Sequence, residues 1–342
     1  MSVTIKDIAQ RAGVSHPTVS RALRGDPIVA AETAARIHRI AAELGYVPSA
    51  TARSLKTSRS HVIGVIVNRI SDPFYSEVLD GIQDALYSAN YSLFLASTDH
   101  DLAREKAVVR AMLERRIDGL IVCSLFVTPP YRSELGASGA PLVVVHNRSR
   151  DPDADAIYHD DYAGSRQMTR HLIDLGHERL AFIGSARAGV ESDDRLAGFR
   201  DEINAAGLTA PPERIVQAAN GELASGSAAV ESLLRLSHRP TALVCFNDML
   251  AIGAMRRLQQ AGYAVPADCS VVGFDDIVLA KFVNPPLTTF NQPKYALGQQ
   301  AAQMMLRLLS AKPRKENGDQ QNRITLRGEI LVRASSAPPP AE

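Results

Sequence analysis

The sequence predicts a small all-α head, followed by a body of two α/β lobes with doubly wound parallel sheets. Three observations lead to this prediction. In residues 4–44, apolar side chains recur at helical spacing in three short segments. From residue 62 onward, continuous apolar runs alternate with helical patterns, which is typical of buried parallel strands and their crossover helices. The alternation comes in two series, so we expect two similar lobes of roughly 100–150 residues each.

Charge is divided unevenly along the 342 residues. Residues 1–60 hold nine basic and four acidic side chains, a net charge of +5, and residues 61–342 hold 29 and 33, a net charge of −4. A basic head on an acidic body is what phosphate binding at one end requires. An ordinary solvated helical face would give the same charge, so charge alone does not decide between the two.

Three cysteines, Cys123, Cys245 and Cys269, lie in apolar runs. Their odd number and wide spacing favour buried free thiols over a disulfide or zinc framework. The sequence has no apolar stretch of about 18 residues and no basic leader before an apolar core. We therefore expect a soluble cytoplasmic protein with no membrane partner.

The head begins with two short helices. Thr4 can cap the first, with Asp7 reaching back from three residues on, and Gly13 ends it. Ser15 caps the second helix, whose first turn tolerates Pro17 because its N–H groups have no partner within the helix. Two short helices joined by a tight turn predict a helix-turn-helix.

The second helix spans residues 16–23 and turns Val19, Ala22 and Leu23 inward. Its outward side chains could meet base edges and phosphates, and they are His16, Pro17, Thr18, Ser20 and Arg21. A third helix is expected from Ala31 to Leu44, with Gly45 as its stop.

A short segment, "GYVPSATARSLKTSRS", follows the head. Pro48 and Ser49 could begin a helix of only about two turns, which is marginal in water. Its exposed Leu55 lies beside Arg53 and Lys56, which suits a hinge ordered by its partner. A plain linker is the alternative.

The body contains two series of apolar runs. The first is "VIGVIVN", "YSLFLAST", "IDGLIVCS" and "PLVVVHN", with helices from Pro73 and Leu102. The second is "RLAFIGS", "RIVQAA", "ALVCFND" and "CSVVGFDD", with helices near 194–206, near 225–236 and up to Ala261. A helix from Pro293 to Leu309 and a final strand "RITLRGEILVRAS" remain, so the chain should cross between the lobes more than once.

These patterns set the expected boundaries. They are a head at 1–47, a hinge at 48–60, an N-terminal lobe at 61–161 plus about 293–320, a C-terminal lobe at 162–290 plus about 321–335, and a disordered tail at 336–342.

Polar side chains gather where the predicted strands end, which is where open α/β sheets bind ligands. They are Asn68, Ser124, Asn147, Ser185, Asn247, Asp248, Asp275 and Gln292. Phe74 and Tyr75 could stack on a ring or sugar, and Arg195 could hold a carboxylate, phosphate or hydroxyl pair. Alternatively, Asp248 only caps a helix, Asp275 is a turn residue, and the aromatic pair covers the core. The convergence of these groups favours a pocket.

Signals for an enzyme are weak. Residues 184–189 have the spacing of a phosphate loop, but Val190 and Glu191 stand where Lys and Ser/Thr should follow. No strand is followed by GxGxxG, no GxSxG is present, and the histidines lack metal-ligand spacing. We predict no catalytic residue, cofactor or metal, and place His171 and His177 at a helix end.

Nearly the whole chain, in order, resembles the LacI/GalR family of bacterial transcription regulators. The matching segments are "VTIKDIAQRAGVSHPTVSRAL", "GYVPSATARSLKT", "DPFYSEVLDGI", "RLAGFR", "FNDMLAIGAM", "SVVGFDD" and "LTTFNQP". The resemblance implies a homodimer on pseudo-palindromic operator DNA. It also implies a body with the fold of periplasmic binding proteins of type I and an effector between its lobes.

The resemblance assigns roles to residues. His16, Pro17 and Arg21 would read bases in the major groove, and Thr18 and Ser20 would touch the backbone, with Thr4 and Ser15 beside them. Leu55, flanked by Ala52 and Lys56, would wedge into the minor groove and kink it. The matching effector positions are Phe74, Tyr75, Ser124, Arg195, Asn247, Asp275 and Gln292.

Three departures from the family pattern matter. Pro17 stands where some relatives place a base-reading Gln, and Ala30 where a capping Ser is common. His146, a further candidate for effector contact, stands where several relatives place an acid, so a sugar hydroxyl contact there would be altered and a sugar effector is less well supported. The C-terminus lacks an apolar heptad tail, so we expect a dimer.

The sequence thus predicts a DNA-binding regulator, most often a repressor, controlled by a sugar or related metabolite. A solute-binding protein is the second hypothesis, and the head argues against it. An α/β enzyme, such as a sugar kinase or dehydrogenase, is the third, and the lack of a phosphate loop argues against that. Effector identity, operator sequence and the direction of the response do not follow from the sequence.

Overall fold

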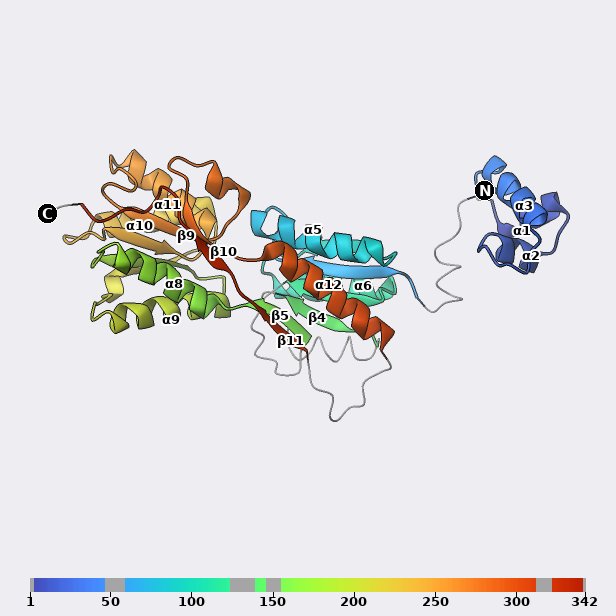
Figure 1. Ribbon diagram of the computed structural model, residues 1–342, viewed down its shortest axis with the longest axis horizontal. Coiled ribbons are helices and arrows are strands. Elements are labelled where there is room, and N and C mark those ends of the chain that lie inside the picture. The colour runs from blue at the N-terminus through green and yellow to red at the C-terminus, as the bar shows by residue number, and fades with distance from the viewer. Residues whose placement is uncertain (1–2, 47–58, 124–138, 146–154, 312–321, 341–342) are drawn as a thin grey trace, which may run out of the picture. The chain divides into compact units, whose positions relative to one another are not determined.

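The computed structural model describes residues 3–46, 59–123, 139–145, 155–311 and 322–340. It contains two compact units, a head at Met1–Ser60 and a body at His61–Glu342 (Figure 1). In the described ranges, no helix has the length and apolar character needed to cross a membrane.

The head is a bundle of three helices, α1 (Ile5–Ala12), α2 (His16–Ala22) and α3 (Ala31–Glu43). Ile8, Val19 and Ile37, one from each helix, are fully buried at its centre. The three helices lie where the sequence predicts them, and of the inward residues predicted for α2, Val19 and Ala22 are buried and Leu23 is half-buried.

Both predicted caps of the head are present. The N–H and the hydroxyl of Thr4 donate to Asp7 Oδ2 over 2.7 Å and 2.8 Å. Ser15 Oγ accepts from the Thr18 N–H at 3.4 Å. Gly13 ends α1 at φ +66°, in the left-handed region that favours glycine. Ala30 precedes α3 without a side-chain cap, as its identity predicts.

The N-terminal lobe of the body is a six-stranded parallel sheet in the order β11-β5-β4-β3-β1-β2. Helices α5 and α12 cover one face of this sheet and α6 packs on the other (Figure 1). Its elements are β1 (Val62–Val67), α5 (Pro73–Ser88), β2 (Ser92–Ser97), α6 (Leu102–Glu114), β3 (Gly119–Cys123), β4 (Leu142–Val145), β5 (Asp155–His159), α12 (Lys294–Ser310) and β11 (Arg323–Leu326).

The C-terminal lobe is a second six-stranded sheet in the order β12-β10-β9-β8-β6-β7, parallel except for β12. Helices α10 and α11 cover one face, and α8 and α9 the other. Its elements are α8 (Asp161–Asp174), β6 (Leu180–Ser185), α9 (Val190–Ala205), η1 (Pro212–Arg214), β7 (Ile215–Ala218), α10 (Leu223–Leu234), β8 (Ala242–Cys245), α11 (Asp248–Gln260), β9 (Ser270–Asp275), η2 (Val278–Lys281), β10 (Thr288–Asn291) and β12 (Glu329–Leu331).

The predicted fold class, a helical head and two doubly wound parallel-sheet lobes, is confirmed. Apolar runs identified most strands because strands covered on both faces are apolar throughout. Two strands, β5 and β10, were not predicted, and α8 was implied only by the placement of His171 and His177 at a helix end. The run "DAIYH" of β5 begins with a charged residue and ends with His159, so it lacks that pattern.

One predicted boundary is wrong. Residues 321–335 were assigned to the C-terminal lobe as one strand, but they form two strands in different lobes. β11 pairs with β5 in the N-terminal lobe, and β12 pairs with β10 in the C-terminal lobe. Gly328 lies between them, and a Cβ there would be 2.2 Å from the carbonyl oxygen of Asn291. The chain therefore crosses between the lobes at this glycine.

The prediction of a disordered tail at 336–342 is also wrong for the described residues 336–340. The Ala337 N–H donates to Ser270 Oγ at 3.0 Å, and its carbonyl accepts from His177 Nε2 at 2.9 Å. Ser336 Oγ lies 3.0 Å from His171 Nε2. The proline-rich composition suggested disorder. However, His171 near the end of α8 and His177 just after it hold the tail to the lobe.

The three cysteines are free and buried, as predicted. Burial raises the pKa of the Cys123 thiol to about 12, and it also raises the pKa of the Cys245 thiol. They are packing residues rather than reactive thiols.

Ending the chain after Ser335 should destabilise the C-terminal lobe. The truncation leaves His177 Nε2 and Ser270 Oγ without their bonds to Ala337. A hydrogen bond contributes about 0.5–1.5 kcal/mol, so losing these bonds should lower the free energy of unfolding in urea by about 1–3 kcal/mol. A chain ending after Pro340 is the matched control. Equal urea midpoints for the two truncations would show that the tail contributes no stability.

Candidate functional site

A cavity of about 370 Å³ lies between the two lobes of the body, at the carboxyl ends of their strands. Its N-terminal-lobe wall includes Asn68, Asp72, Phe74, Tyr75 and His100, and its C-terminal-lobe wall includes Ser185, Glu191, Arg195, Phe246, Asn247 and Asp275. This is the edge at which open parallel sheets bind ligands, as the strand-end residues predicted.

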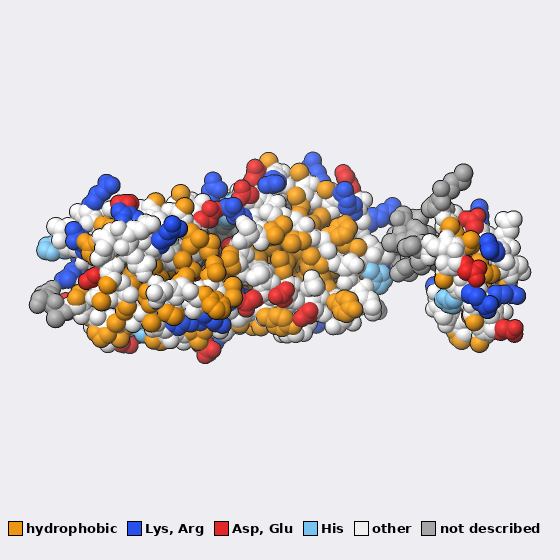
Figure 2. All heavy atoms as spheres, turned by 90° about the horizontal axis from the view of Figure 1, so that it is seen from above, with side chains coloured by type: hydrophobic (Ala, Val, Ile, Leu, Met, Phe, Trp, Pro, Cys, Tyr) orange, Lys and Arg blue, Asp and Glu red, His pale blue; other side chains and the backbone are white. Residues whose placement is uncertain are grey.

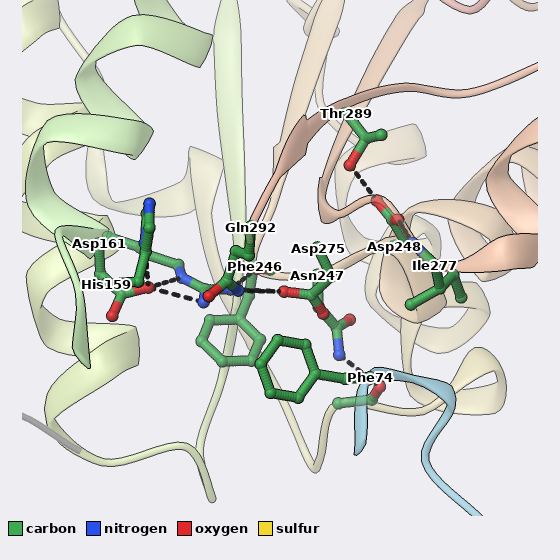
Figure 3. Close-up of polar contacts among 12 residues, drawn as sticks. Phe74, His159, Asp161, Phe246, Asn247, Asp248, Asp275, Ile277, Thr289 and Gln292 are labelled. Carbon is green, nitrogen blue, oxygen red and sulfur yellow. Dashed lines mark hydrogen bonds and ion pairs between the residues drawn. The ribbon is translucent and has the colours of Figure 1, made fainter. Parts of the chain in front are cut away.

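Arg195 projects from α9 into the C-terminal-lobe wall and is 2% exposed. Its Nε and Nη2 lie 2.8 Å and 2.7 Å from Asp161 Oδ1. Its Nη1 donates to the carbonyl of Phe246 and lies 3.8 Å from Asp275 Oδ1 (Figure 3). The guanidinium is therefore held by acceptors on three elements before any ligand arrives.

Two aromatic rings pack against the same guanidinium. Arg195 Cζ lies 3.8 Å from the centroid of the Phe274 ring and 4.4 Å from that of Phe246. A cation over a ring face is attracted by the ring quadrupole, and the attraction is stronger when the cation is desolvated. Stacking and ion pairing together fix the orientation of Arg195.

Asp275 ends β9 in a strained conformation, with φ at +118°. Gln292 Nε2 donates to its Oδ1 at 2.6 Å, and Lys294 Nζ donates to its carbonyl at 2.5 Å. Burial raises the pKa of the Asp275 carboxyl well above its ordinary value, and Arg195 opposes that rise. The bonds from Gln292, just after β10, and from Lys294 of α12 hold this backbone conformation in place.

Asn247 and Asp248 have different roles although they are neighbours. Asn247 caps α11 by accepting from the Leu250 N–H at 2.9 Å, and it also lines the cavity. Asp248 is fully buried behind the cavity and accepts from the Ile277 N–H at 2.8 Å and from Thr289 Oγ1 at 2.5 Å. Burial raises the pKa of Asp248 to about 7. Asp248 therefore supports the loop after β9 and does not touch the cavity.

The N-terminal-lobe wall presents aromatic rings. The Tyr75 hydroxyl donates to the Cys123 carbonyl at 3.2 Å and accepts from Asn68 Nδ2 at 3.3 Å. The Phe74 ring meets the Tyr75 ring edge to face, with centroids 5.3 Å apart. Phe74 and Phe246, from opposite lobes, offer apolar surface to a ligand (Figure 3).

An ion pair closes the rim of the cavity. Arg69 of the N-terminal lobe pairs with Glu222 of the C-terminal lobe, and its Nε lies 3.7 Å from Asp99 Oδ1. The Arg69 and Glu222 side chains are 43% and 42% exposed, so the pair contributes about 0–1 kcal/mol. A contact this weak can break when the lobes open.

The structure places most of the predicted effector residues at the cavity. Phe74, Tyr75, Arg195, Asn247 and Asp275 line it. Gln292 does not line it, because its side chain lies behind Asp275. Ser124, His146 and Asn147 lie outside the described residues.

Sequence reasoning missed Glu191, His100 and Phe246, which line the cavity, and Asp161, which holds Arg195. Glu191 precedes Arg195 by four residues on α9, so both share one helical face, and that spacing could have identified it. Asp161 follows the unpredicted strand β5 and carried no such signal.

The head exposes the predicted DNA-contacting face. His16, Pro17 and Arg21 are exposed, whereas Thr18 and Ser20 are half-buried. Arg24 donates to Ser20 Oγ at 3.1 Å. Basic side chains lie on the surface of the head in Figure 2. Thr4 and Ser15 are exposed and act as helix caps. Ala52, Leu55 and Lys56 lie outside the described residues.

Family models match both units of the chain. A model of bacterial regulatory proteins of the lacI family matches residues 4–49. A model of the periplasmic binding protein-like domain matches residues 169–336.

Relatives of similar length match nearly the whole chain. The HTH-type transcriptional repressor PurR of Aliivibrio fischeri (strain MJ11) is 37% identical over 341 residues, which is 97% of this chain and 98% of the relative. The repressor of the same name from Aliivibrio salmonicida is 33% identical over 333 residues, again 97% of this chain and 98% of the relative.

Solved structures also match nearly the whole chain. The lac repressor dimer bound to operator and the anti-inducer ONPF has a TM-score of 0.87 at 26% identity, covering 98% of this chain and 100% of that one. The complex of the transcriptional regulator CelR with cellobiose has a TM-score of 0.73 at 27% identity, covering 97% of this chain and 99% of that one.

Replacing Arg195 with Ala should cost about 3–5 kcal/mol in the free energy of unfolding, because it removes the cation beside two buried carboxylates. Adding Asp161→Asn should recover much of that loss, which a double-mutant cycle measures by urea denaturation. Arg200→Ala, at an exposed position of the same helix, is the control. If Arg195→Ala unfolded at the same urea concentration as Arg200→Ala, the ion network would contribute nothing.

Proposed function

The chain belongs to the LacI family of bacterial regulatory proteins, and on that premise we propose that it is a transcriptional repressor controlled by a small-molecule effector. Similarity to repressors along the whole chain is the observation that carries the proposal. The repressor binds operator DNA as a homodimer through its head and holds the effector between the lobes of its body. It works in the bacterial cytoplasm and is associated with the nucleoid when bound to DNA.

The head reads DNA through α2. In a helix-turn-helix, the second helix enters the major groove and its exposed N-terminal residues reach base edges. His16 and Pro17 lie at the N-terminus of α2 and Arg21 in its last turn, and the exposure of all three leaves them free to contact bases. Thr18 and Ser20 contact the phosphate backbone, with the capping residues Thr4 and Ser15 beside them. Pro17 removes one backbone donor from the contact surface.

The hinge, residues 48–60, is proposed to become helical only when the protein is bound to DNA. Two turns of helix are marginal in water, so the hinge forms when DNA supplies a partner. Leu55, with Ala52 and Lys56 on either side, then inserts into the minor groove. Burial of Leu55 between base pairs supplies the apolar contact that the isolated segment lacks.

The effector occupies the cavity between the lobes. A volume of about 370 Å³ lies within the range of small-molecule sites, and aromatic walls with a few fixed polar groups are typical of them. The effector is a sugar or related metabolite, in keeping with the cellobiose complex of the structurally similar regulator CelR. Its proposed contacts are Phe74, Tyr75, Ser124, His146, Arg195, Asn247 and Asp275, with Gln292 positioning Asp275.

Effector binding shifts the balance between arrangements of the two lobes. A ligand that touches both walls favours the arrangement in which it touches them, and only that difference in affinity drives the shift. The exposed Arg69–Glu222 pair adds little to either arrangement. The lobes in turn set the separation of the two hinges in the dimer, and so the affinity for DNA.

The two other hypotheses are less well supported. A solute-binding protein needs no DNA-binding head, whereas residues 4–49 match that of the lacI family. An enzyme is not favoured either, because the relatives that match nearly the whole chain are transcriptional repressors. The chain is therefore a regulator rather than an enzyme.

Arg21→Ala should weaken binding to an operator selected from random DNA by about 1–3 kcal/mol, because it removes an exposed cation from the reading helix. Fluorescence anisotropy at several salt concentrations measures the loss and the slope of affinity against salt. The matched control is Arg39→Ala, at an exposed position of α3. Equal losses for the two variants, or wild-type binding that ignores salt, would contradict recognition by α2.

Leu55→Ala should reduce operator affinity by about 1–3 kcal/mol, the order of one buried apolar side chain. Effector binding should stay intact because the cavity lies entirely in the body. Anisotropy and calorimetry on the same preparation separate the two activities. Unchanged operator affinity would remove Leu55 from the interface, and loss of both activities would indicate misfolding.

A further inference from the structure

Three buried side-chain atoms at the cavity have no hydrogen-bond partner among the described residues. They are Asn68 Oδ1, His100 Nδ1 and Glu191 Oε2. Buried polar atoms in proteins are almost always paired, so such a cluster at a cavity indicates groups that a ligand satisfies. Asn68 and His100 belong to the N-terminal lobe and Glu191 to the C-terminal lobe.

The hydrogen bonds that these side chains already make show which of their atoms remain without a partner among the described residues. Asn68 Nδ2 is used in donating to the Tyr75 hydroxyl at 3.3 Å, so its free atom is the acceptor oxygen. Glu191 is 4% exposed in the first turn of α9, and its free atom is a carboxyl oxygen. Two unsatisfied oxygens from opposite lobes therefore face a ligand that must supply hydrogen-bond donors.

The charged groups at the cavity also favour a ligand that supplies hydrogen-bond donors. Among the described residues, its walls carry five carboxyl groups, those of Asp72, Asp99, Glu191, Glu222 and Asp275, and three guanidinium groups, those of Arg69, Arg187 and Arg195. Arg69 is already paired with Glu222, and Arg195 with Asp161. The third, Arg187, is exposed, so solvent screens its attraction for an anion. A phosphate or carboxylate on the ligand would therefore find no unpaired buried guanidinium among the described residues of the wall.

The shortage of hydrogen-bond donors is clearest at Glu191. Burial and the neighbouring Asp161 raise the pKa of its carboxyl well above the ordinary value, and Arg195 offsets only part of that rise. Its Oε2 has no hydrogen-bond donor among the described residues. A hydroxyl or amine from a ligand would supply the missing donor.

We propose that the effector is an uncharged or amine-bearing compound that donates hydrogen bonds to Asn68 and Glu191 at the same time, and that phosphorylated and carboxylated metabolites are excluded. This rests on the function proposed above and narrows its effector class. The two acceptors belong to different lobes. A ligand that bridges them therefore directly favours the arrangement in which the two cavity walls lie close together. Glu191 is then a specificity-determining residue, since a site built around an acceptor rejects analogues that lack the donor.

The test is a calorimetric panel of matched pairs, offered to the full chain. The pairs are ribose and ribose 5-phosphate, adenosine and adenosine monophosphate, glucosamine and glucosamine 6-phosphate, and glucose and gluconate. We expect binding among the uncharged or amine-bearing members, with at least tenfold weaker binding by each anionic counterpart. Tighter binding by any anionic member would overturn the proposal, and so would a panel in which no uncharged or amine-bearing member binds. Operator binding by the same preparation would show that the regulatory function survives either result.

The role of Glu191 is tested by measuring how tightly the Glu191→Gln variant binds the compound of the panel for which the wild type has the highest affinity. The amide puts a donor near the ligand's own donor, so we expect at least a tenfold loss of affinity. The matched control is Asp193→Asn, in the same helical turn and outside the cavity wall, which should change affinity less than threefold. The thermal midpoint of each ligand-free variant checks its folding. Wild-type affinity in a folded Glu191→Gln variant, or an equal loss in both variants, would overturn the role of Glu191.

Discussion

The chain crosses between the two lobes of the body three times, and these crossings support the ligand cavity. The rest of the body depends on this constraint. Asp161 follows the first crossing, after β5, and holds Arg195. Gln292 and Lys294 follow the second, after β10, and hold the side chain and the carbonyl of Asp275. The third crossing, at Gly328, packs against the second. Figure 1 shows these segments side by side between the lobes. Any change in the angle between the lobes must therefore move residues that support the cavity wall.

This arrangement explains why so many charges are buried where a simpler core would be more stable. A buried ion pair seldom repays the cost of removing its charges from water. Arg195, however, is fixed by Asp161, by Phe274 and by the Phe246 carbonyl, so its direction is set before the ligand binds. By contrast, Asn68 and Glu191 retain unsatisfied oxygens. We infer that the fixed groups orient the ligand and that the unsatisfied ones distinguish between ligands.

Local sequence patterns were enough to predict the helical head and its caps, most strands of both lobes, and the cavity residues that stand directly after those strands. They failed where a residue's role depends on a distant partner. The strand β5 was missed because its short run has charged and polar ends, and Asp161 was missed with it. Gln292 was placed at the cavity, but its partner Asp275 lies in between. The proline-rich tail was expected to be disordered because its composition does not reveal His171 and His177, which hold it from more than 150 positions earlier in the sequence.

The central claim is that the cavity and the DNA-binding head influence each other through the arrangement of the lobes. The most direct test is reciprocity, because two coupled binding sites must change each other's affinity by the same factor. Affinity for the ligand that binds the cavity would be measured by calorimetry with and without saturating operator DNA, and operator affinity with and without saturating ligand. Coupling between the two sites predicts equal factors that differ from one, in either direction. Ligand affinity that is the same with and without operator would contradict it.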